Sequence, residues 1–276
     1  MVAAGDRLRV FVGMHEESVL PRGVILNQCD GHTPLHSVQG DNDRDGERGS
    51  ADGLFALPPD ADPRQLAMLA INPPTAALLL SEYVNLKPGE WVVQNAANSG
   101  VGRWVIAFAK RRGLKTVNIV RRPELVPELE AIGGDVVVVE SPDVSERIKA
   151  AVGHAEVRLA LDGVSGPATG VLAATLSPGG TLVSFAAMSS NPTSISPLDV
   201  IFKPVTVQGF FMGHPEFAAK LAPAAAQAAE MIASGQVHIP VAATYALSSI
   251  KEAVAHAQRG GKVLLDVARK DGGSKP

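Results

Sequence analysis

The sequence predicts an α/β fold built on a doubly wound parallel sheet. Three observations lead to this prediction. Short apolar, β-favouring runs alternate with helix-length runs between residues 90 and 211, the pattern that builds a parallel sheet covered by helices on both faces. A turn of small residues at 95–102 joins the first strand to a helix. A pair of arginines follows the second strand.

The composition allows one large or two modest domains and excludes several classes of protein. The chain has 276 residues, a formal net charge of −3 and one cysteine, Cys29. The charge gives no sign of a nucleic-acid or membrane partner, and one cysteine excludes both an internal disulfide and a metal site built on several thiolates. Because no apolar run reaches membrane-spanning length and the first residues lack a signal-like pattern, we expect a cytoplasmic protein.

The stretch at 90–120 predicts a strand, a turn, a helix and a second strand. Residues 90–94 form an apolar strand-like run, 103–112 carry apolar side chains at helical spacing before Gly113, and 115–120 form the second strand. Such a turn aims backbone N–H groups and the positive end of a helix dipole at one spot. That spot suits a pyrophosphate.

The match of this turn to the dinucleotide-binding pattern G-x-G-x-x-G is imperfect. Aligned on the last glycine, the three positions are Ala97, Ser99 and Gly102, and only the third glycine, which allows close helix–strand packing, is kept. A tight turn without a ligand is the alternative. We assign five turn residues to cofactor binding: Asn98, Ser99, Gly100, Val101 and Gly102.

Arg121 and Arg122 indicate which dinucleotide is bound. Folds that use NAD place an acid at this strand end to bond the ribose 2′-hydroxyl, whereas NADP-binding folds place an arginine there. Here the arginines precede the first acid, Glu124, and a guanidinium suits a 2′-phosphate. The sequence therefore predicts NADPH in a Rossmann fold, with two solvated surface charges as the alternative.

Three motifs carry a family resemblance: Asn-Pro-Pro-Thr-Ala at 72–76, Leu-Lys-Pro-Gly-Glu-Trp-Val-Val-Gln-Asn-Ala at 86–96, and Asn-Ser-Gly-Val-Gly at 98–102. They resemble medium-chain dehydrogenase/reductases, most closely the zinc-independent 2-enoyl thioester reductases (trans-2-enoyl-CoA reductases) and next the NADPH quinone reductases. The resemblance runs from about residue 54 to 268. It implies a Rossmann NADPH-binding domain at 76–236. It also implies a second, incomplete β-rich domain, a partial GroES-like catalytic domain, at 1–75 and 237–276.

The first 53 residues depart from that family. The strand expected at 6–13 sits well inside the family's catalytic domain, so the chain looks truncated at its N-terminus. Residues 14–53 are expected to be flexible because 40–50 hold no apolar residue. His15, His32 and His36 accompany Cys29 there, but their spacing fits no standard zinc pattern, so we expect no metal site.

The remaining elements continue the alternation. Helices are expected at 62–71, 75–83, 128–132, 145–152, 168–176, 215–234 and 248–259, and extended segments at 135–139, 159–162, 181–185, 206–211, 237–245 and 262–266. Ligands bind beyond the carboxyl ends of such strands. That rule predicts that six residues after strand ends line a pocket: Asp162, Ala187, Met188, Phe210, Phe211 and Met212. The alternative is that these loops are ordinary strand ends without a ligand.

The resemblance adds roles to these positions. It implies that the loops at 186–188 and 210–212 flank the nicotinamide and ribose, and that Lys262 faces the cofactor; a solvated lysine is the alternative. It places Asn72, Pro74 and Thr75 beside the nicotinamide as substrate-pocket residues. Thr75 as a plain helix N-cap is equally consistent with the sequence.

The implied reaction is hydride transfer from NADPH to the β-carbon of an α,β-unsaturated thioester, followed by protonation at the α-carbon. The resembling enzymes use an N-terminal tyrosine as the donor, and neither Tyr83 nor Tyr245 matches it; core packing is expected for Tyr83, so the catalytic acid is unknown. A quinone reductase and a non-catalytic NADPH-binding fragment are the alternatives. The apolar last strand, 206–211, predicts a sheet edge and homodimerisation through it.

Overall fold

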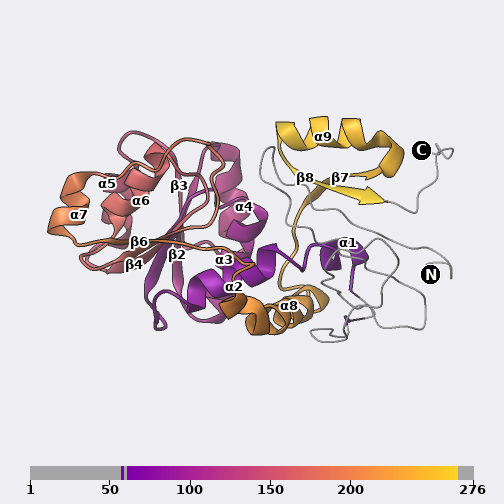
Figure 1. Cartoon of the computed structure of the whole chain (residues 1–276), viewed down its shortest axis with the longest axis horizontal. Coiled ribbons are helices and arrows are strands. Elements are labelled where there is room, and N and C mark those ends of the chain that lie inside the picture. The colour runs from indigo at the N-terminus through magenta and orange to yellow at the C-terminus, as the bar shows by residue number, and fades with distance from the viewer. Residues whose placement is uncertain (1–56, 59–60, 267–276) are drawn as a thin grey trace. The chain divides into compact units, whose positions relative to one another are not determined.

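The computed structural model describes residues 57–58 and 61–266, which form two compact units (Figure 1). The larger unit is Asn72–Phe217, and the smaller combines the described residues before it with those from 218 to 266. The domain boundaries predicted at 75–76 and 236–237 and the GroES-like character of the smaller domain stay predictions. The strand predicted at 6–13, the flexible stretch at 14–53 and its four candidate metal ligands lie outside the described residues.

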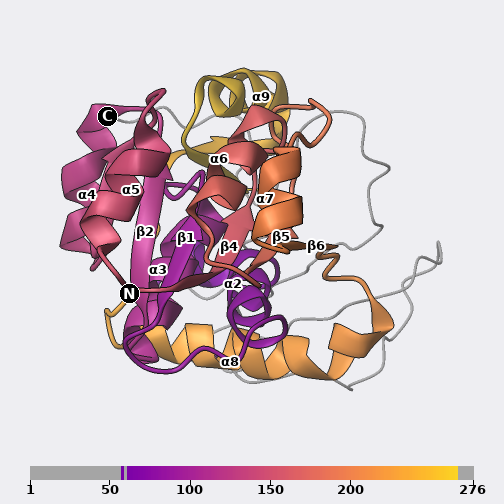
Figure 2. The ribbon, with the colours of Figure 1, turned by 90° about the vertical axis from the view of Figure 1, so that its left-hand side faces the viewer.

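The larger unit contains a six-stranded parallel sheet in the order β3-β2-β1-β4-β5-β6, and Figure 2 shows five of these strands side by side in that order. The strands are β1 Trp91–Gln94, β2 Lys115–Val120, β3 Val136–Val139, β4 Val157–Asp162, β5 Thr181–Ser184 and β6 Thr206–Gly209. The predicted doubly wound sheet is confirmed, and β6 is an edge strand as expected. The order reverses between β1 and β4, where such folds bind dinucleotides.

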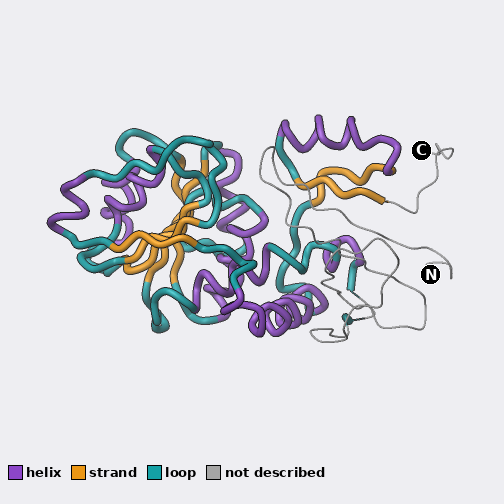
Figure 3. The backbone as a smooth tube through the Cα atoms, in the orientation of Figure 1, coloured by secondary structure: helices purple, strands orange, loops and turns teal. Residues whose placement is uncertain are grey.

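Helices cover both faces of this sheet (Figure 3). They are α2 Asn72–Ser81, α3 Gly100–Arg111, α4 Val126–Ala131 after the 3₁₀ turn η1 Pro123–Leu125, α5 Val144–Val152, α6 Pro167–Thr175 and α7 Pro197–Phe202. Successive residues of β2 face opposite sides of the sheet and so contact different helices. Ile119 packs in one apolar cluster with Ile148 of α5 and Leu172 of α6. Val120 packs in the other cluster with Ile106 of α3 and Leu129 of α4.

The smaller unit pairs two parallel strands, β7 Val241–Ala246 and β8 Lys262–Asp266, through the 3₁₀ turn η3 Leu247–Ser249 and helix α9 Ile250–Arg259. It also holds α1 Pro63–Leu66 and α8 Ala218–Ala233. The side chain of Gln65 in α1 exchanges two hydrogen bonds with the backbone of Ile239, of 2.9 and 2.8 Å. Among the described residues, no helix is both long enough and apolar enough to cross a membrane.

Several element boundaries differ from the sequence predictions, and three of them bear on the predicted site. Helix α1 ends at Leu66 instead of residue 71, and β6 ends at Gly209 instead of residue 211. Helix α2 begins at Asn72, so Thr75 lies inside the helix and is not its N-cap. The physical reason is that Pro73 and Pro74 occupy the first turn, where the backbone N–H groups have no helical acceptor, so that these prolines start a helix.

Candidate functional site

The turn after β1 has the geometry of an anion cradle. Ser99 is the N-cap of α3, and its Oγ accepts a hydrogen bond of 3.1 Å from the backbone N–H of Gly102. The next N–H groups, of Gly100 and Val101, belong to the first helical turn and precede the helix's own acceptors. A Cβ atom on Gly102 would lie 2.4 Å from the carbonyl oxygen of Ala97, so only glycine permits this close approach of helix to strand.

Two of the predicted substrate-pocket residues meet predicted cofactor residues in space. A Cβ atom on Gly100 would lie 2.3 Å from the amide nitrogen of Asn72, so the Asn72 side chain covers that glycine. The Thr75 hydroxyl donates to the sulfur of Met212, at 3.7 Å. Pro74 is buried in the same helix, α2. Segments that are far apart in the sequence therefore converge beside the α3 N-terminus and the loop after β6.

Arg103 is part of this turn, although the sequence analysis did not select it. Its side chain is 9% exposed, and its Nη2 lies 2.6 Å from Oε2 of Glu128 in α4. Its Nε donates to the carbonyl oxygen of Asn98 in the turn, at 3.3 Å. The guanidinium thus ties the turn to α4. Its position in the first turn of α3 is a sequence signal for such a role. A cation there is unfavourable for the helix dipole, and a nearby carboxylate offsets this.

Arg121 and Arg122 are both exposed at the carboxyl end of β2, as the sequence predicts. Arg122 forms an ion pair of 3.5 Å with Glu124, and both side chains are more than half exposed, at 59% and 62%. Ion pairs of this kind contribute little to stability. The side chains of Arg121 and Arg122 are both accessible from solvent.

Asp162 occupies the end of β4, as predicted, but its side chain is directed to the protein interior. It is fully buried, and its carboxylate accepts hydrogen bonds from the side chains of Asn95 and Thr169 and from the backbone N–H groups of Val164 and Ser165. All four donors are protein groups. This arrangement gives Asp162 a structural role, since its hydrogen bonds connect β4, the loop after it and α6.

The loops after β5 and β6 present a mixture of buried and exposed side chains. Met188 is 63% exposed and Phe211 64%, whereas Phe210 is buried, with its ring centroid 5.2 Å from that of Phe217. Ala187 is exposed. Lys262 lies in the smaller unit at the start of β8, where burial lowers the pKa of its ammonium group.

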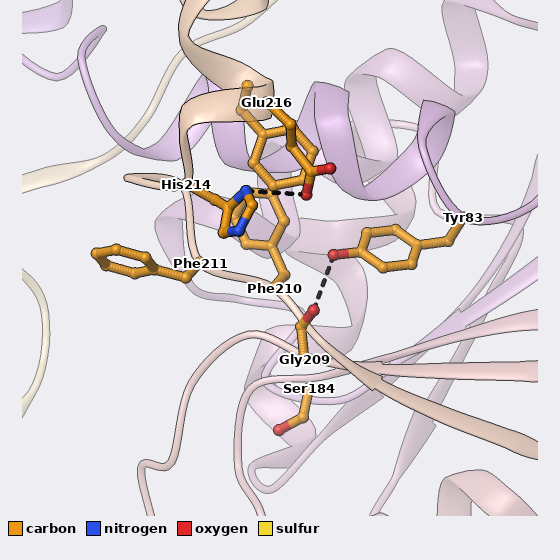
Figure 4. Close-up of a pocket in the computed structure, with 8 residues that line it drawn as sticks. Tyr83, Ser184, Gly209, Phe210, Phe211, His214 and Glu216 are labelled. Carbon is orange, nitrogen blue, oxygen red and sulfur yellow. Dashed lines mark hydrogen bonds and ion pairs between the residues drawn. The ribbon is translucent and has the colours of Figure 1, made fainter.

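A pocket of about 250 Å³ adjoins the carboxyl ends of β5 and β6 (Figure 4). The Tyr83 hydroxyl donates to the carbonyl oxygen of Gly209 at 3.0 Å, and Nδ1 of His214 lies 3.3 Å from Oε1 of Glu216. Burial raises the pKa of Tyr83, and the Glu216 and Glu82 carboxylates add to this. Eight residues line the pocket: Tyr83, Ser184, Gly209, Phe210, Phe211, His214, Glu216 and Phe217.

The sequence analysis selected Phe210 and Phe211 of this pocket and missed its polar residues. His214 and Glu216 belong to no recognisable motif, and Tyr83 was expected to pack in the core; it is half-buried and bonded to the edge strand instead. Within residues 57–58 and 61–266, no group of three or more His, Cys, Asp or Glu side chains is placed to hold a metal ion.

Comparison with known proteins agrees with this geometry. Residues 100–227 match the family described as zinc-binding dehydrogenases. The mitochondrial enoyl-[acyl-carrier-protein] reductase of Dictyostelium discoideum is 37% identical over 164 residues, which cover 58% of this chain and 47% of that protein. The human mitochondrial enoyl-[acyl-carrier-protein] reductase is 35% identical over 173 residues, covering 60% of this chain and 46% of that protein. The chain thus spans about half the length of the curated relatives it matches.

Solved structures extend the comparison. A mutant enoyl thioester reductase from Candida tropicalis superposes with a TM-score of 0.69 and 26% identity, covering 79% of this chain and 68% of that one. A protein from Bacillus thuringiensis, provisionally assigned as an NADPH:quinone reductase, superposes with a TM-score of 0.78 and 20% identity, covering 96% of this chain and 92% of that one. This second match concerns the fold alone.

The comparisons correct one expectation and confirm another. The cytoplasmic location expected from the sequence is contradicted, because these sequence relatives are named mitochondrial enzymes. The family resemblance is confirmed: the matched family, the identities to the enoyl reductases and the superposition on an enoyl thioester reductase agree with one another. Over residues 100–227 the chain matches the zinc-binding dehydrogenase family, and it is similar to enoyl thioester reductases of the medium-chain dehydrogenase/reductase type.

Proposed function

We propose that the protein is an NADPH-dependent oxidoreductase that reduces the C=C bond of 2-enoyl thioesters. The observation that carries the proposal is the exposed arginine pair at the end of β2. It accompanies the turn before α3, in which position 102 has room only for glycine. The identity to proteins named enoyl reductases supports the substrate class. Since the chain spans about half of those proteins, their activity is proposed here for this chain.

The residues of the turn and of the β2 end would divide the anionic cofactor between them. The N–H groups of Gly100 and Val101, at the positive end of the α3 dipole, would bind the pyrophosphate. The guanidinium groups of Arg121 and Arg122 would bind the 2′-phosphate, because a planar fork matches phosphate oxygens. Arg103 would keep the turn in place through its hydrogen bond to the Asn98 carbonyl.

The rest of the proposed site lies around α2 and the loops after β5 and β6. Residues Ala187, Met188, Phe210, Phe211 and Met212 would flank the nicotinamide, and Lys262 would face the cofactor. Asn72, Pro74 and Thr75 would line the substrate pocket. When bound, NADPH supplies the hydride for the β-carbon of the substrate. We assign no residue as the proton donor to the α-carbon.

We further propose that the reaction needs no zinc, although the matched family is described as zinc-binding. The support comes from the amino-acid sequence, in which Cys29 is the single cysteine. Zinc alcohol dehydrogenases require several cysteine ligands. Activity that survives dialysis against a chelator, with metal content measured on the same sample, is the expected result.

The direct test of the proposed function is NADPH consumption by the purified protein, followed at the nicotinamide absorbance with a short 2-enoyl thioester. We expect oxidation of NADPH that depends on the thioester, with a product saturated at the 2,3 bond. The same assay with a quinone tests the alternative function, that of a quinone reductase. NADPH binding with no turnover on either substrate would favour the non-catalytic alternative and defeat the enzymatic proposal.

We also propose that the protein forms a homodimer through β6. Every residue of this edge strand is exposed, and α7 beside it buries none of its side chains. Val207 of the strand and Leu198, Ile201 and Phe202 of the helix are large apolar residues, exposed by 43%, 62%, 66% and 74%. An apolar strand edge of this kind pairs readily with another chain. Sedimentation at micromolar concentration should give the mass of two chains, and a monomer would defeat the proposal.

A further inference from the structure

Asp162 is the centre of a buried hydrogen-bond network at the point where the strand order reverses. Its Oδ1 accepts from Nδ2 of Asn95 at 2.7 Å and from the backbone N–H groups of Val164 and Ser165 at 2.9 Å each. Its Oδ2 accepts from the Thr169 hydroxyl at 2.6 Å. Asp162 and Thr169 are completely buried and Asn95 is 5% exposed. Breaking a fully satisfied buried network of this kind is costly, because it leaves unpaired polar groups.

Asn95 connects this network to the turn after β1. Its Oδ1 accepts from the backbone N–H of Gly163 at 2.8 Å, so the Asn95 amide bonds both to the last residue of β4 and to the one after it. The adjoining residues Ala96 and Ser165 have left-handed φ angles of 46° and 68°. Such a conformation is strained for a residue other than glycine and persists only where the surroundings enforce it.

The loop that Asp162 holds in place supports the next loop of the sheet. The Ser165 hydroxyl donates to the carbonyl oxygen of Ala186 at 3.2 Å. The backbone N–H groups of Met188 and Ser189 donate to the carbonyl oxygens of Gly163 and Val164, at 3.3 and 2.9 Å. The hydrogen bonds therefore run from the turn after β1, through the Asp162 carboxylate, to the loop after β5.

We propose that Asp162 is a positioning residue for the nicotinamide half of the cofactor, which it does not itself touch. The inference rests on the proposed function. In a doubly wound fold each half of the sheet receives one mononucleotide, and the loops that Asp162 holds follow β4 and β5. In the proposed function the adenosine half depends on the β2 end and on the α3 N-terminus, and the network meets the turn before α3 at Asn95. Removing the carboxylate should therefore weaken the nicotinamide contacts and spare the adenosine contacts.

The test compares two ligands on two variants of the full chain. One ligand is NADPH, and the other is adenosine 2′,5′-bisphosphate, which lacks the nicotinamide half. For Asp162→Ala we expect the Kd for NADPH to rise about tenfold or more and the Kd for the bisphosphate to change less than about twofold. Asp162→Asn should retain nearly native affinity for both, because the amide oxygen can still accept and its NH₂ can donate to the Thr169 hydroxyl.

Two further variants keep this test decisive. Asp135→Ala is the matched control: Asp135 bonds to the backbone N–H of Thr116 at 2.9 Å, at the amino end of the sheet, so both affinities should stay native. If Asp162→Ala fails to fold, Thr169→Val removes one of the four hydrogen bonds at constant shape, and NADPH should bind about threefold more weakly with the bisphosphate unaffected.

Each outcome has one meaning. Native NADPH affinity in Asp162→Ala, or in Thr169→Val where that variant must replace it, would overturn the positioning role. So would an equal loss of both ligands in a variant that folds. An Asp162→Asn variant as weak as Asp162→Ala would assign the effect to the charge of the carboxylate and would also overturn it. Failure of the native chain to bind either ligand would instead defeat the proposed function.

Discussion

The two halves of the central sheet differ in how completely the chain covers them. Strands β1, β2 and β3 pack against α3 and α4 on one face and α5 on the other, and the turn after β1 is closed by the contact of Gly102 with Ala97. Strand β6, at the edge of the other half, is exposed along its length, and its neighbour α7 is exposed as well. The pocket with Tyr83 and His214 opens beside that exposed edge.

This difference indicates which of the proposed cofactor contacts one chain can provide by itself. In the first half the proposed adenosine and pyrophosphate contacts, Arg121, Arg122 and the α3 N-terminus, come from one packed set of elements. In the second half the proposed nicotinamide and substrate contacts border apolar surface that a second copy would cover. Dinucleotide affinity should therefore depend mainly on the first half, and assembly on the second.

The largest effect is expected from adding one methyl group in the first half. Gly102→Ala places a Cβ against the backbone of Ala97, which should destabilise the fold by about 1–3 kcal/mol and abolish NADPH binding. Gly209→Ala in β6 is the matched change in the second half, since a Cβ there meets nothing within 4 Å. Urea unfolding measures the stability of the two variants, and a fluorescence titration measures their affinity for NADPH. Equal losses of stability and affinity in both variants would contradict the proposed difference between the two halves of the sheet.

The next largest effect should come from the arginine pair. Replacing Arg121 and Arg122 with alanine removes the proposed 2′-phosphate contacts, each charge-assisted, and should weaken NADPH binding about 10–100-fold while leaving NADH binding unchanged. Arg111, exposed at the opposite end of α3, provides the control substitution. A loss of NADH affinity as large as that of NADPH would show that the pair does not recognise the 2′-phosphate.

A smaller effect is expected at the exposed edge. Phe202→Asp should raise the dimer dissociation constant about tenfold or more, because it places a charge in the proposed apolar contact. The control is Val254→Asp on α9, which alters another exposed apolar residue, 51% exposed. Sedimentation velocity over a concentration series measures both, and the proposal requires that only the first variant dissociate.

The smallest effect is expected at Tyr83. Its folded-state pKa is raised, so the folded protein holds the phenol proton more tightly than the unfolded chain does. The corresponding stability is complete below the unfolded pKa of about 10 and is lost as the pH rises through the folded pKa. Between pH 9 and 11 the native protein should lose more stability than Tyr83→Phe, as measured by urea unfolding; parallel curves would exclude this linkage.

The sequence predicts the parts of the fold that local patterns determine. The alternation of strands and helices identified the parallel sheet, and the turn at 95–102 and the arginines at 121–122 lie where the predicted strands placed them. These features depend on residues adjacent in the chain. Their recognition needs no knowledge of long-range packing.

The rest depends on contacts between distant residues. The position of Asp162 at the end of a strand predicted that it binds the cofactor. In the structure its carboxylate accepts a hydrogen bond from Asn95, 67 residues away. Arg103 gains its role from Glu128, and the Tyr83 hydroxyl meets Gly209, 126 residues later. Helix α2 begins at Asn72, three residues before its expected start, because Pro73 and Pro74 fit its first turn. No local pattern encodes these pairings, because tertiary packing decides them.

The measurement that tests the central claim most directly is a parallel fluorescence titration of the native protein with NADPH and with NADH. The exposed arginine pair at the end of β2 predicts that NADPH binds at least about tenfold more tightly than NADH, with a preference that fades as salt screens the 2′-phosphate contact. Equal affinity for the two dinucleotides, or no binding of either, would contradict the account of this protein as an NADPH-dependent reductase.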